Sequence, residues 1–238
     1  MESRKIIIPG ETIVTGEEYL PGEGTRREKD DIVASKFGLA DVSDKLIRVI
    51  PLSGVYIPRR GNVVIGEVVD VTFNGWLIDF NGPMNGFLSV AEVPRYINKD
   101  ELQECFDFGD MILAKVWNVK AKGVDLSVKL RGFGKLEDGM IMKVNANKVP
   151  RVIGKEGSMV SLIKEGTGCD ITVGQNGIVW LMGKTIDDEL KAKKVIEFIC
   201  ENSFIDGLTE KVKDFMEKLK WVKNQVIRKE QTEESLTN

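Results

Sequence analysis

Hydrophobic and polar residues alternate in short runs over the first part of the chain, which is the period of half-buried β-strands. In residues 1–57, β-like apolar runs fall at residues 6–8, 12–14 and 46–50, separated by Pro-Gly and glycine-containing turns. This pattern predicts a small all-β domain over residues 1–57.

A second group of alternating runs lies in residues 58–131. It covers residues 60–80, broken at the hairpin-forming pair Asn74-Gly75, and continues at residues 84–93, 109–119 and 124–130. Five short strands in about 70 residues favour a closed β-barrel over an open sheet with exposed edges.

The pattern changes in residues 138–203, where helical periods enter. A strand at residues 140–149 is followed by a short helical turn, the loop G-K-E-G at residues 154–157, and a second helix with Ser158 as its predicted N-cap. Strands at 169–173 and 178–182 then form a hairpin through G-Q-N-G, and a third helix follows. The predicted order is βααββα, an α+β domain.

One more amphipathic helix is predicted over residues 204–229, before a polar tail at residues 230–238. Its apolar positions alternate in steps of four and three: Leu208, Val212, Phe215, Leu219, Val222 and Val226. We expect this apolar stripe to pack on the chain's own preceding domain, because a single stripe of this length is common in globular helices.

Composition limits the chemistry that the chain can perform. Hydrophobic residues make up 42% and charged residues 30%, no apolar run approaches the ~20 residues of a membrane span, and the N-terminus lacks the pattern of a signal peptide. There is no histidine, and the three cysteines form no C-x-x-C pair. We therefore expect a cytoplasmic protein with no membrane partner, no metal, no cofactor and no catalytic residue.

The net charge of −3 gives the whole chain no general attraction for nucleic acid. One window, residues 139–164, is clearly basic: it contains Glu156 and the cations Lys143, Lys148, Arg151, Lys155 and Lys164. The G-K-E-G loop lies inside this window, which is typical of a local nucleic-acid contact.

The barrel segment resembles a known RNA-binding module. Its elements G-x-V-x-x-G-x-V, N-G-W, G-F-L-S-V-A-E, G-D-M-I-L-A-K-V and L-S-V-K occur in the order of the S1-type OB barrel. The resemblance implies that Trp76 and Phe87 stack on bases and that Lys115 contacts RNA, although both aromatic residues could instead fill the barrel core. Ser89 and Ala91 stand where the family often has His and Ser, and this departure implies weaker or shared RNA binding.

The βααββα segment, with G-x-x-G between its first two helices, resembles a type I KH domain. In that family the loop clamps the RNA backbone, which implies RNA contacts at Lys148, Arg151, Gly154, Lys155 and Gly157. The alternative is an ordinary connector between helices, and Glu156 opposes a phosphate contact.

An N-terminal β domain, an S1-type barrel and one KH domain together resemble the RNA-binding cap subunits of the archaeal exosome. The most specific marks are V-I-P-L-S-G-V-Y-I-P-R-R-G at residues 49–61 and G-Q-N-G at residues 174–177. Gly174, Asn176 and Gly177 are interpreted as a structural signature, with Asn176-Gly177 in a hairpin turn. For Gln175 and Asn176 we expect a structural role first and contact with a neighbour second.

The exosome resemblance implies a non-catalytic subunit that binds single-stranded RNA and guides its 3′ end towards 3′-to-5′ degradation. Three copies would form a homotrimeric cap, alone or mixed with another cap subunit, on a hexameric ring of ribonuclease-PH-like subunits. The domain at residues 1–57 would dock on that ring.

Two other families combine the same modules. Transcription elongation or antitermination factors of the Nus class run from S1 into KH, but they carry a second KH domain for which too few residues remain. Polynucleotide phosphorylase places KH before S1 and carries catalytic domains ahead of both. The acidic run Asp187-Asp188-Glu189 is interpreted as the first turn of a helix and not as a nuclease metal site.

Overall fold

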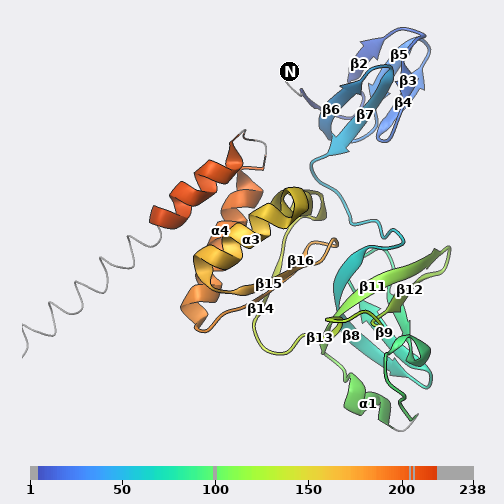
Figure 1. The fold of residues 1–238 in the computed structure, drawn as a ribbon. Helices are drawn as coiled ribbons and strands as arrows, with labels where there is room; N and C mark the ends of the chain where they lie inside the picture. Colours follow the sequence, from blue (N-terminus) through green and yellow to red (C-terminus); the bar gives the residue numbers. More distant parts are fainter. Residues whose placement is uncertain (1–4, 99–100, 204, 206, 219–238) are drawn as a thin grey trace, which may run out of the picture. The chain divides into compact units, whose positions relative to one another are not determined.

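A computed structural model describes residues 5–98, 101–203, 205 and 207–218 of the chain (Figure 1). The chain divides into two compact units, Met1–Val55 with Asn145–Asn147, and Tyr56–Val144 with Lys148–Asn238. The multidomain fold class expected from the sequence is confirmed: an all-β domain, a β-barrel and an α+β KH domain.

The described part of the first unit contains two small sheets. The four-stranded sheet has the order β1 (Ile6–Ile7), β6 (Gly38–Ser43), β7 (Leu46–Pro51) and β3 (Leu20–Pro21). The three-stranded sheet has the order β2 (Thr12–Thr15), β5 (Asp31–Ala34) and β4 (Thr25–Glu28). Ile7 and Val49 of the first sheet and Ala34 of the second are buried together in one cluster.

The sequence pattern missed strands β3, β4, β5 and β6, of which β3 has only two residues and β4 is polar. Strand β4 has the sequence T-R-R-E, and its charged residues are exposed. Arg27 of this strand donates hydrogen bonds to the backbone carbonyls of Gly16, Glu17 and Tyr19, so it holds a loop in place. Here main-chain pairing, and not an apolar face, defines the strand.

The second unit begins with the predicted closed barrel of five strands. These are β8 (Val63–Thr72), β9 (Gly75–Asp79), β10 (Gly86–Ser89), β11 (Met111–Lys120) and β12 (Gly123–Ser127). Strand β12 closes the barrel because it pairs in parallel with β10 and antiparallel with β11. A short strand, β13 (Gly134–Lys135), adds to the edge of β11.

The β8–β9 hairpin forms one residue earlier than the Asn-Gly pair suggested. Thr72 pairs with Gly75, so Phe73 and Asn74 are the loop residues. Gly75 is needed for a close approach, since a Cβ there would lie 2.1 Å from the carbonyl oxygen of Leu88 on β10.

Tyr56 anchors the chain where it enters the barrel, within the sequence mark at residues 49–61. Its ring meets Phe80 edge-on with 6.1 Å between centroids, and its hydroxyl donates to Asn62 Oδ1 at 2.8 Å. Burial raises the pKa of Tyr56 to about 12, so the phenol stays neutral and keeps this hydrogen bond over the physiological range.

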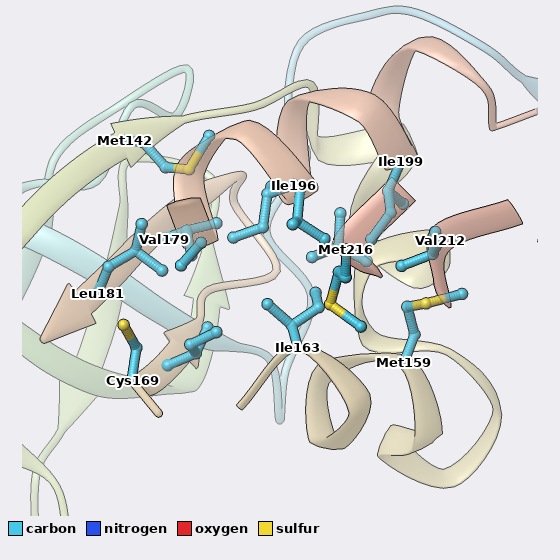
Figure 2. Close-up of a cluster of buried hydrophobic side chains, with 14 of the residues drawn as sticks. Met142, Met159, Ile163, Cys169, Val179, Leu181, Ile196, Ile199, Val212 and Met216 are labelled. Atoms are coloured by element: carbon cyan, nitrogen blue, oxygen red, sulfur yellow. The ribbon is translucent and has the colours of Figure 1, made fainter. Parts of the chain in front are cut away.

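The KH domain has the predicted element order. It consists of β14 (Met140–Lys143), α2 (Val149–Ile153), α3 (Ser158–Thr167), β15 (Asp170–Val173), β16 (Ile178–Met182) and α4 (Ile186–Glu201), with sheet order β14-β16-β15. Side chains from the sheet and helices meet in one apolar core, drawn in Figure 2.

A final helix over residues 208–218 packs on the KH core, as expected. Leu208, Val212 and Met216 are buried in that core, and Figure 2 labels the last two. Phe215 stacks on Phe198 of α4 at 4.3 Å between centroids. Three further positions of the predicted apolar stripe, Leu219, Val222 and Val226, lie outside the described residues.

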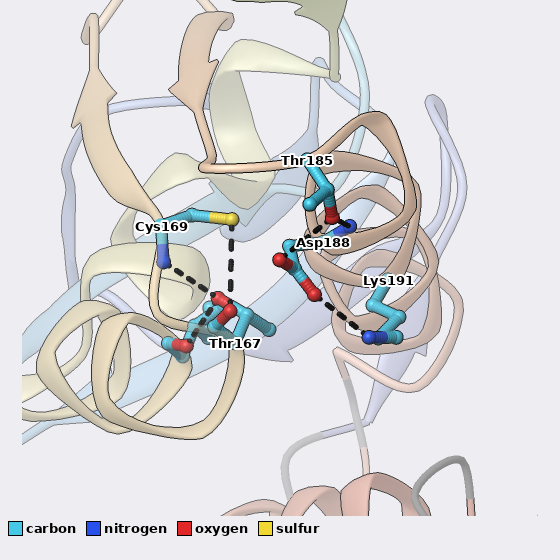
Figure 3. A network of polar contacts seen from close by, with 6 residues as sticks. Thr167, Cys169, Thr185, Asp188 and Lys191 are labelled. Carbon is cyan, nitrogen blue, oxygen red and sulfur yellow. Dashed lines mark hydrogen bonds and ion pairs between the residues drawn. The ribbon is translucent and has the colours of Figure 1, made fainter. Parts of the chain in front are cut away.

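Helix α4 begins with a side-chain cap, shown in Figure 3. The Asp188 N–H donates to Thr185 Oγ1 at 3.3 Å, and the Asp188 carboxylate accepts from Thr185 Oγ1 and from Lys191, each at 2.8 Å. Asp187, Asp188 and Glu189 thus form the acidic first turn of α4, which the helix dipole favours. The helical interpretation of this acidic run is confirmed.

The G-Q-N-G turn between β15 and β16 joins the KH domain to the barrel. Asn176 is 1% exposed; its Oδ1 accepts from the Ile65 N–H at 3.2 Å, and its Nδ2 donates to the carbonyls of Ile65 and Phe80, each at 2.7 Å. Beside it, the Gln175 N–H donates to the Val63 carbonyl and the Val63 N–H donates to Gln175 Oε1. The turn therefore pairs with the main chain at the start of β8, at Val63 and Ile65.

Apolar side chains surround this polar contact. Ile65 on β8, Leu113 on β11 and Ile178 on β16 are buried together, with Trp180 and Phe133 packed against them. We call the Asn176 hydrogen bonds and this cluster the seam. It fixes the barrel and the KH domain to each other through contacts that neither domain could satisfy alone.

Within the described residues, no helix combines the length and apolar character needed to cross a membrane.

Replacing Asn176 with Ala tests the seam. The change leaves the Ile65 amide and two backbone carbonyls unpaired in a buried place, so we expect the free energy of unfolding of the second unit to fall by about 2–4 kcal/mol. Hydrogen exchange of the Ile65 amide should accelerate in parallel, measured together with urea unfolding.

The matched control is Gln175→Ala, in the same turn but exposed. It removes one side-chain hydrogen bond and should cost about 1 kcal/mol or less. Equal, small losses for the two variants would mean that Asn176 does not hold the seam.

Candidate nucleic-acid interface

The two barrel aromatics predicted to stack on RNA have different places. Trp76 is 0% exposed; its indole N–H donates to the Phe106 carbonyl at 2.8 Å, and its ring meets the Phe106 ring edge-on at 5.1 Å. The prediction that Trp76 stacks on a base is therefore wrong, because both faces of its ring are covered by the barrel core.

Phe87 lies on the outside of the barrel. Its neighbours on β10, Gly86 and Leu88, are buried, while Phe87 is only partly covered. Across the parallel pairing with β12, Phe87 is directly opposite Asp125, which also alternates with two buried residues. These two side chains therefore share the outer face.

A third outward residue, Trp117, completes this face. It is the extra residue of a β-bulge on β11, between Val116, which pairs with Leu126, and Asn118, which pairs with Asp125. Trp117 is 53% exposed, and the Arg60 guanidinium lies over its ring at 5.4 Å from the centroid. The bulge turns this aromatic side chain outwards beside Asp125.

Phe87 and Trp117 line a pocket of about 310 Å³. Its polar lining residues are Ser89, Glu92, Lys120 and Asp125, and Leu126 contributes an apolar part. Lys120 pairs with Asp125 at 2.7 Å, and Lys129 pairs with Glu92 at 3.1 Å. The pocket is thus aromatic and polar, with its charges balanced.

Lys115 lies two residues before Trp117 on β11 and is partly exposed. Its register partners are Ser127 on β12 and Val63 on β8, and Val63 packs against the seam. The predicted contact residue therefore lies between the seam and the Trp117 face.

Ser89, where the S1 family often has a His, has a local structural role. Its Oγ accepts the Ala91 N–H at 3.3 Å and caps the short 3₁₀ turn Val90–Glu92.

The KH loop has the shape that its two glycines allow. Gly154, Glu156 and Gly157 all have positive φ, of 75°, 54° and 82°. Gly157, and not Ser158, occupies the N-cap position of α3. The predicted Ser158 cap is wrong by one residue, because a left-handed glycine already turns the chain into the helix.

The two loop glycines are required for different reasons. A Cβ on Gly154 would lie 2.6 Å from the Met159 backbone nitrogen, so this glycine lets the loop pack on α3. A Cβ on Gly157 would meet nothing within 4 Å. Open space at Gly157 is compatible with the close approach of a ligand, whereas Gly154 has a structural explanation.

The predicted basic contacts flank this loop. Arg151, in the last turn of α2, and Lys155, in the loop, are both exposed, while Lys148, the residue before α2, is half-buried. Glu156 is also exposed.

The signature turn closes the hairpin between β15 and β16. Gly174 and Gly177 close the hairpin, with the Gly177 N–H donating to the Gly174 carbonyl at 3.0 Å and φ of 86° at Gly177. The neighbour that Asn176 contacts is the barrel of the same chain.

The structure thus separates the predicted residues into a barrel face, a KH loop and the seam. Sequence reasoning missed the pocket residues Trp117, Glu92 and Asp125. The sequence held one signal for Asp125: it alternates with the apolar residues Val124 and Leu126 in V-D-L, so its side chain lies on the outer face of the strand. In the part of the chain that the structure describes, no group of three or more His, Cys, Asp or Glu side chains is placed to hold a metal ion.

Family models match two parts of the chain. The model for the exosome complex exonuclease RRP4 N-terminal region matches residues 6–43, and the KH domain model matches residues 139–187. The exosome complex component Rrp4 of Methanothermus fervidus is 40% identical over 217 residues, which cover 91% of this chain and 96% of the relative. The chain belongs to the Rrp4 family.

Other Rrp4 relatives and a solved structure agree with this assignment. The Methanothermobacter thermautotrophicus Rrp4 is 42% identical over 236 residues, covering 99% of this chain and 74% of the relative. A crystal structure described provisionally as an exosome complex RNA-binding protein is 34% identical, with a TM-score of 0.65 over 71% of this chain and 99% of that one. The family resemblance inferred from the motifs is confirmed.

Because Trp76 lies in the barrel core, its replacement should affect stability and not RNA affinity. We expect Trp76→Phe to lower the free energy of unfolding by about 1–3 kcal/mol, since the indole hydrogen bond and part of the packing are lost. RNA affinity of the folded variant should stay within about twofold of the wild type. A large loss of affinity while circular dichroism is unchanged would restore Trp76 as a contact residue.

Alanine substitutions at the two loop glycines should differ. Gly154→Ala combines a positive φ with a backbone clash and should lower the free energy of unfolding by more than about 2 kcal/mol, whereas Gly157→Ala should cost about 1–2 kcal/mol from φ alone. Thermal unfolding measures both, and similar costs would contradict the structural role of Gly154.

Proposed function

We propose that this Rrp4-family chain is a non-catalytic, RNA-binding cap subunit of an exosome. In this proposal it binds single-stranded RNA and guides the 3′ end into a hexameric ring of ribonuclease-PH-like subunits for 3′-to-5′ phosphorolysis. Three copies form the cap, alone or with a second type of cap subunit, and the assembly works in the cytoplasm.

The observation that carries the proposal is the near full-length similarity to relatives named as exosome complex components. The similar crystal structure, described as an RNA-binding protein of that complex, supports the RNA-binding part. The similarity includes the N-terminal domain, the barrel and the KH domain, so the proposal uses all three and not one motif.

Two surfaces of the second unit, which we call RNA grips, are available to contact RNA. The exposed Arg151 and Lys155 stand beside the open Gly157, where backbone amides at the start of α3 favour a phosphate. The barrel face offers Phe87 and Trp117 for base stacking, with Lys115 on the same strand as Trp117. The first grip is electrostatic, and the second uses ring surfaces.

A nearly neutral chain can bind RNA in this way through linked weak contacts. The seam fixes the KH loop and the barrel face within one unit, so binding at one raises the effective concentration of RNA at the other. Three copies in a cap would multiply this effect. No grip then needs high affinity, which is consistent with Glu156 standing in the loop.

The non-catalytic part of the proposal rests on the residues. The chain has no histidine for general base catalysis, and the Asp187-Asp188-Glu189 run is engaged at the start of α4. The family model for the N-terminal region carries the word exonuclease. The proposal therefore needs a direct assay of whether the isolated chain degrades RNA.

Reversing two charges at the KH loop tests the RNA grip. We expect Arg151→Glu with Lys155→Glu to weaken binding of a single-stranded RNA by about tenfold or more, and to lower the slope of log affinity against log salt by about 1.4. Fluorescence anisotropy over a salt series measures both quantities. The wild type should release no nucleotides from RNA in phosphate and magnesium.

The control reverses two exposed cations elsewhere, Lys194 and Lys211, which gives the same change in net charge. It should weaken binding far less than the loop variant. Equal effects of the two double variants would remove the KH loop from the interface, and nucleotide release by the purified chain would overturn the non-catalytic role.

A further inference from the structure

The barrel pocket has the walls of a base-binding site. Phe87 from β10 and Trp117 from the β11 bulge present ring surfaces to the same cavity of about 310 Å³. That volume lies at the low end of the range for small-molecule sites. Flat, exposed rings around a cavity of this size suit a flat heterocycle, and an unpaired RNA base is the heterocycle that the proposed function supplies.

The charges of the pocket favour a base over a phosphate. Lys120 and Lys129 each form an ion pair with a pocket carboxylate, that of Asp125 or Glu92, so the lining has no excess positive charge. A phosphate would have to approach both carboxylates. The Arg60 guanidinium lies over the ring of Trp117, where it can reach the backbone of a stacked nucleotide.

The polar groups of the lining select among the bases. Each lysine contacts one carboxylate oxygen of its partner, Asp125 Oδ2 or Glu92 Oε1, which leaves the second oxygen as an acceptor. Acceptors pair with bases that present donors. Guanine has two adjacent donors on its Watson–Crick edge and suits a carboxylate best, adenine and cytosine offer one amino group each, and uracil flanks its single donor with two carbonyls.

We propose that the pocket between Phe87 and Trp117 receives one unpaired RNA base and selects guanine over uracil through Glu92 and Asp125. This inference rests on the proposed RNA-binding function. It adds base selectivity to it, in a pocket where Trp117 provides stacking and the two carboxylates provide discrimination.

The test uses the full chain and four RNA hexamers that differ at one position: oligouridylate and the same hexamer with a single guanine, adenine or cytosine. Because uracil is the disfavoured base, the single different base should set the register on the pocket. We expect the guanine hexamer to bind about tenfold more tightly than oligouridylate, with adenine and cytosine between them.

The variant Glu92→Gln with Asp125→Asn should bring the guanine-to-uracil affinity ratio close to one. The ratio is the readout, since the loss of negative charge raises affinity for every RNA. The matched control, Glu67→Gln with Asp70→Asn, makes the same charge change at two exposed residues of β8 outside the pocket and should keep the wild-type ratio.

Trp117→Ala should weaken binding of all four hexamers by about tenfold, because one stacking surface is lost. Its control is Tyr96→Ala, an aromatic residue 90% exposed and outside the pocket lining, which should change little. Circular dichroism confirms that each variant is folded.

A ratio that survives in the Glu92/Asp125 variant, or hexamer binding unchanged by Trp117→Ala, would overturn the pocket while leaving RNA binding intact. Equal wild-type affinity for all four hexamers would also overturn it. If the wild type binds no hexamer at low salt, the proposed function itself fails.

Discussion

The side-chain amide of Asn176 is the contact on which the arrangement of the second unit depends. It is buried at the end of a KH hairpin, yet all three of its hydrogen bonds go to the barrel backbone, at Ile65 and Phe80. A buried amide with partners in another domain is satisfied only when the two domains are in place. The apolar cluster of Ile65, Leu113 and Ile178 then adds the burial that makes the association favourable.

This constraint explains how weak RNA contacts can act together. The KH loop carries two exposed cations but also Glu156, and the barrel face is balanced in charge, so neither surface is a strong trap for RNA. Fixed within one unit, they can engage one strand with a smaller loss of orientational freedom than two freely jointed domains. In the proposed binding mode, the barrel face contributes ring surfaces and polar acceptors, and the KH loop contributes attraction for the backbone.

Most of the fold was predictable from the sequence, because the barrel and KH domain follow regular periods. In these two domains the strand and helix order and the G-Q-N-G hairpin were predicted from alternation, glycine positions and family motifs, but the strand predicted over residues 140–149 ends at Lys143. Strands such as β4, T-R-R-E, were not, since their pairing is set by the backbone and their side chains are polar. The cap of α3 was misplaced because Gly157 at positive φ performs the turn assigned to Ser158.

The candidate site was harder to predict than the fold. Trp76 and Trp117 are both aromatic residues on barrel strands, and alternation alone does not tell which side of a closed sheet is the core. A bulge decides the place of Trp117, and a hydrogen bond to Phe106 explains the burial of Trp76. The barrel partners of Asn176, Ile65 and Phe80, lie 111 and 96 residues earlier in the chain, beyond any local pattern. Purification of the tagged chain from its native cells, followed by identification of its partners and a phosphorolysis assay, tests the exosome assignment most directly. We predict that ribonuclease-PH-like subunits co-purify and that the complex releases nucleoside diphosphates from RNA in phosphate; recovery of the chain alone, or with RNA polymerase subunits, would contradict the assignment.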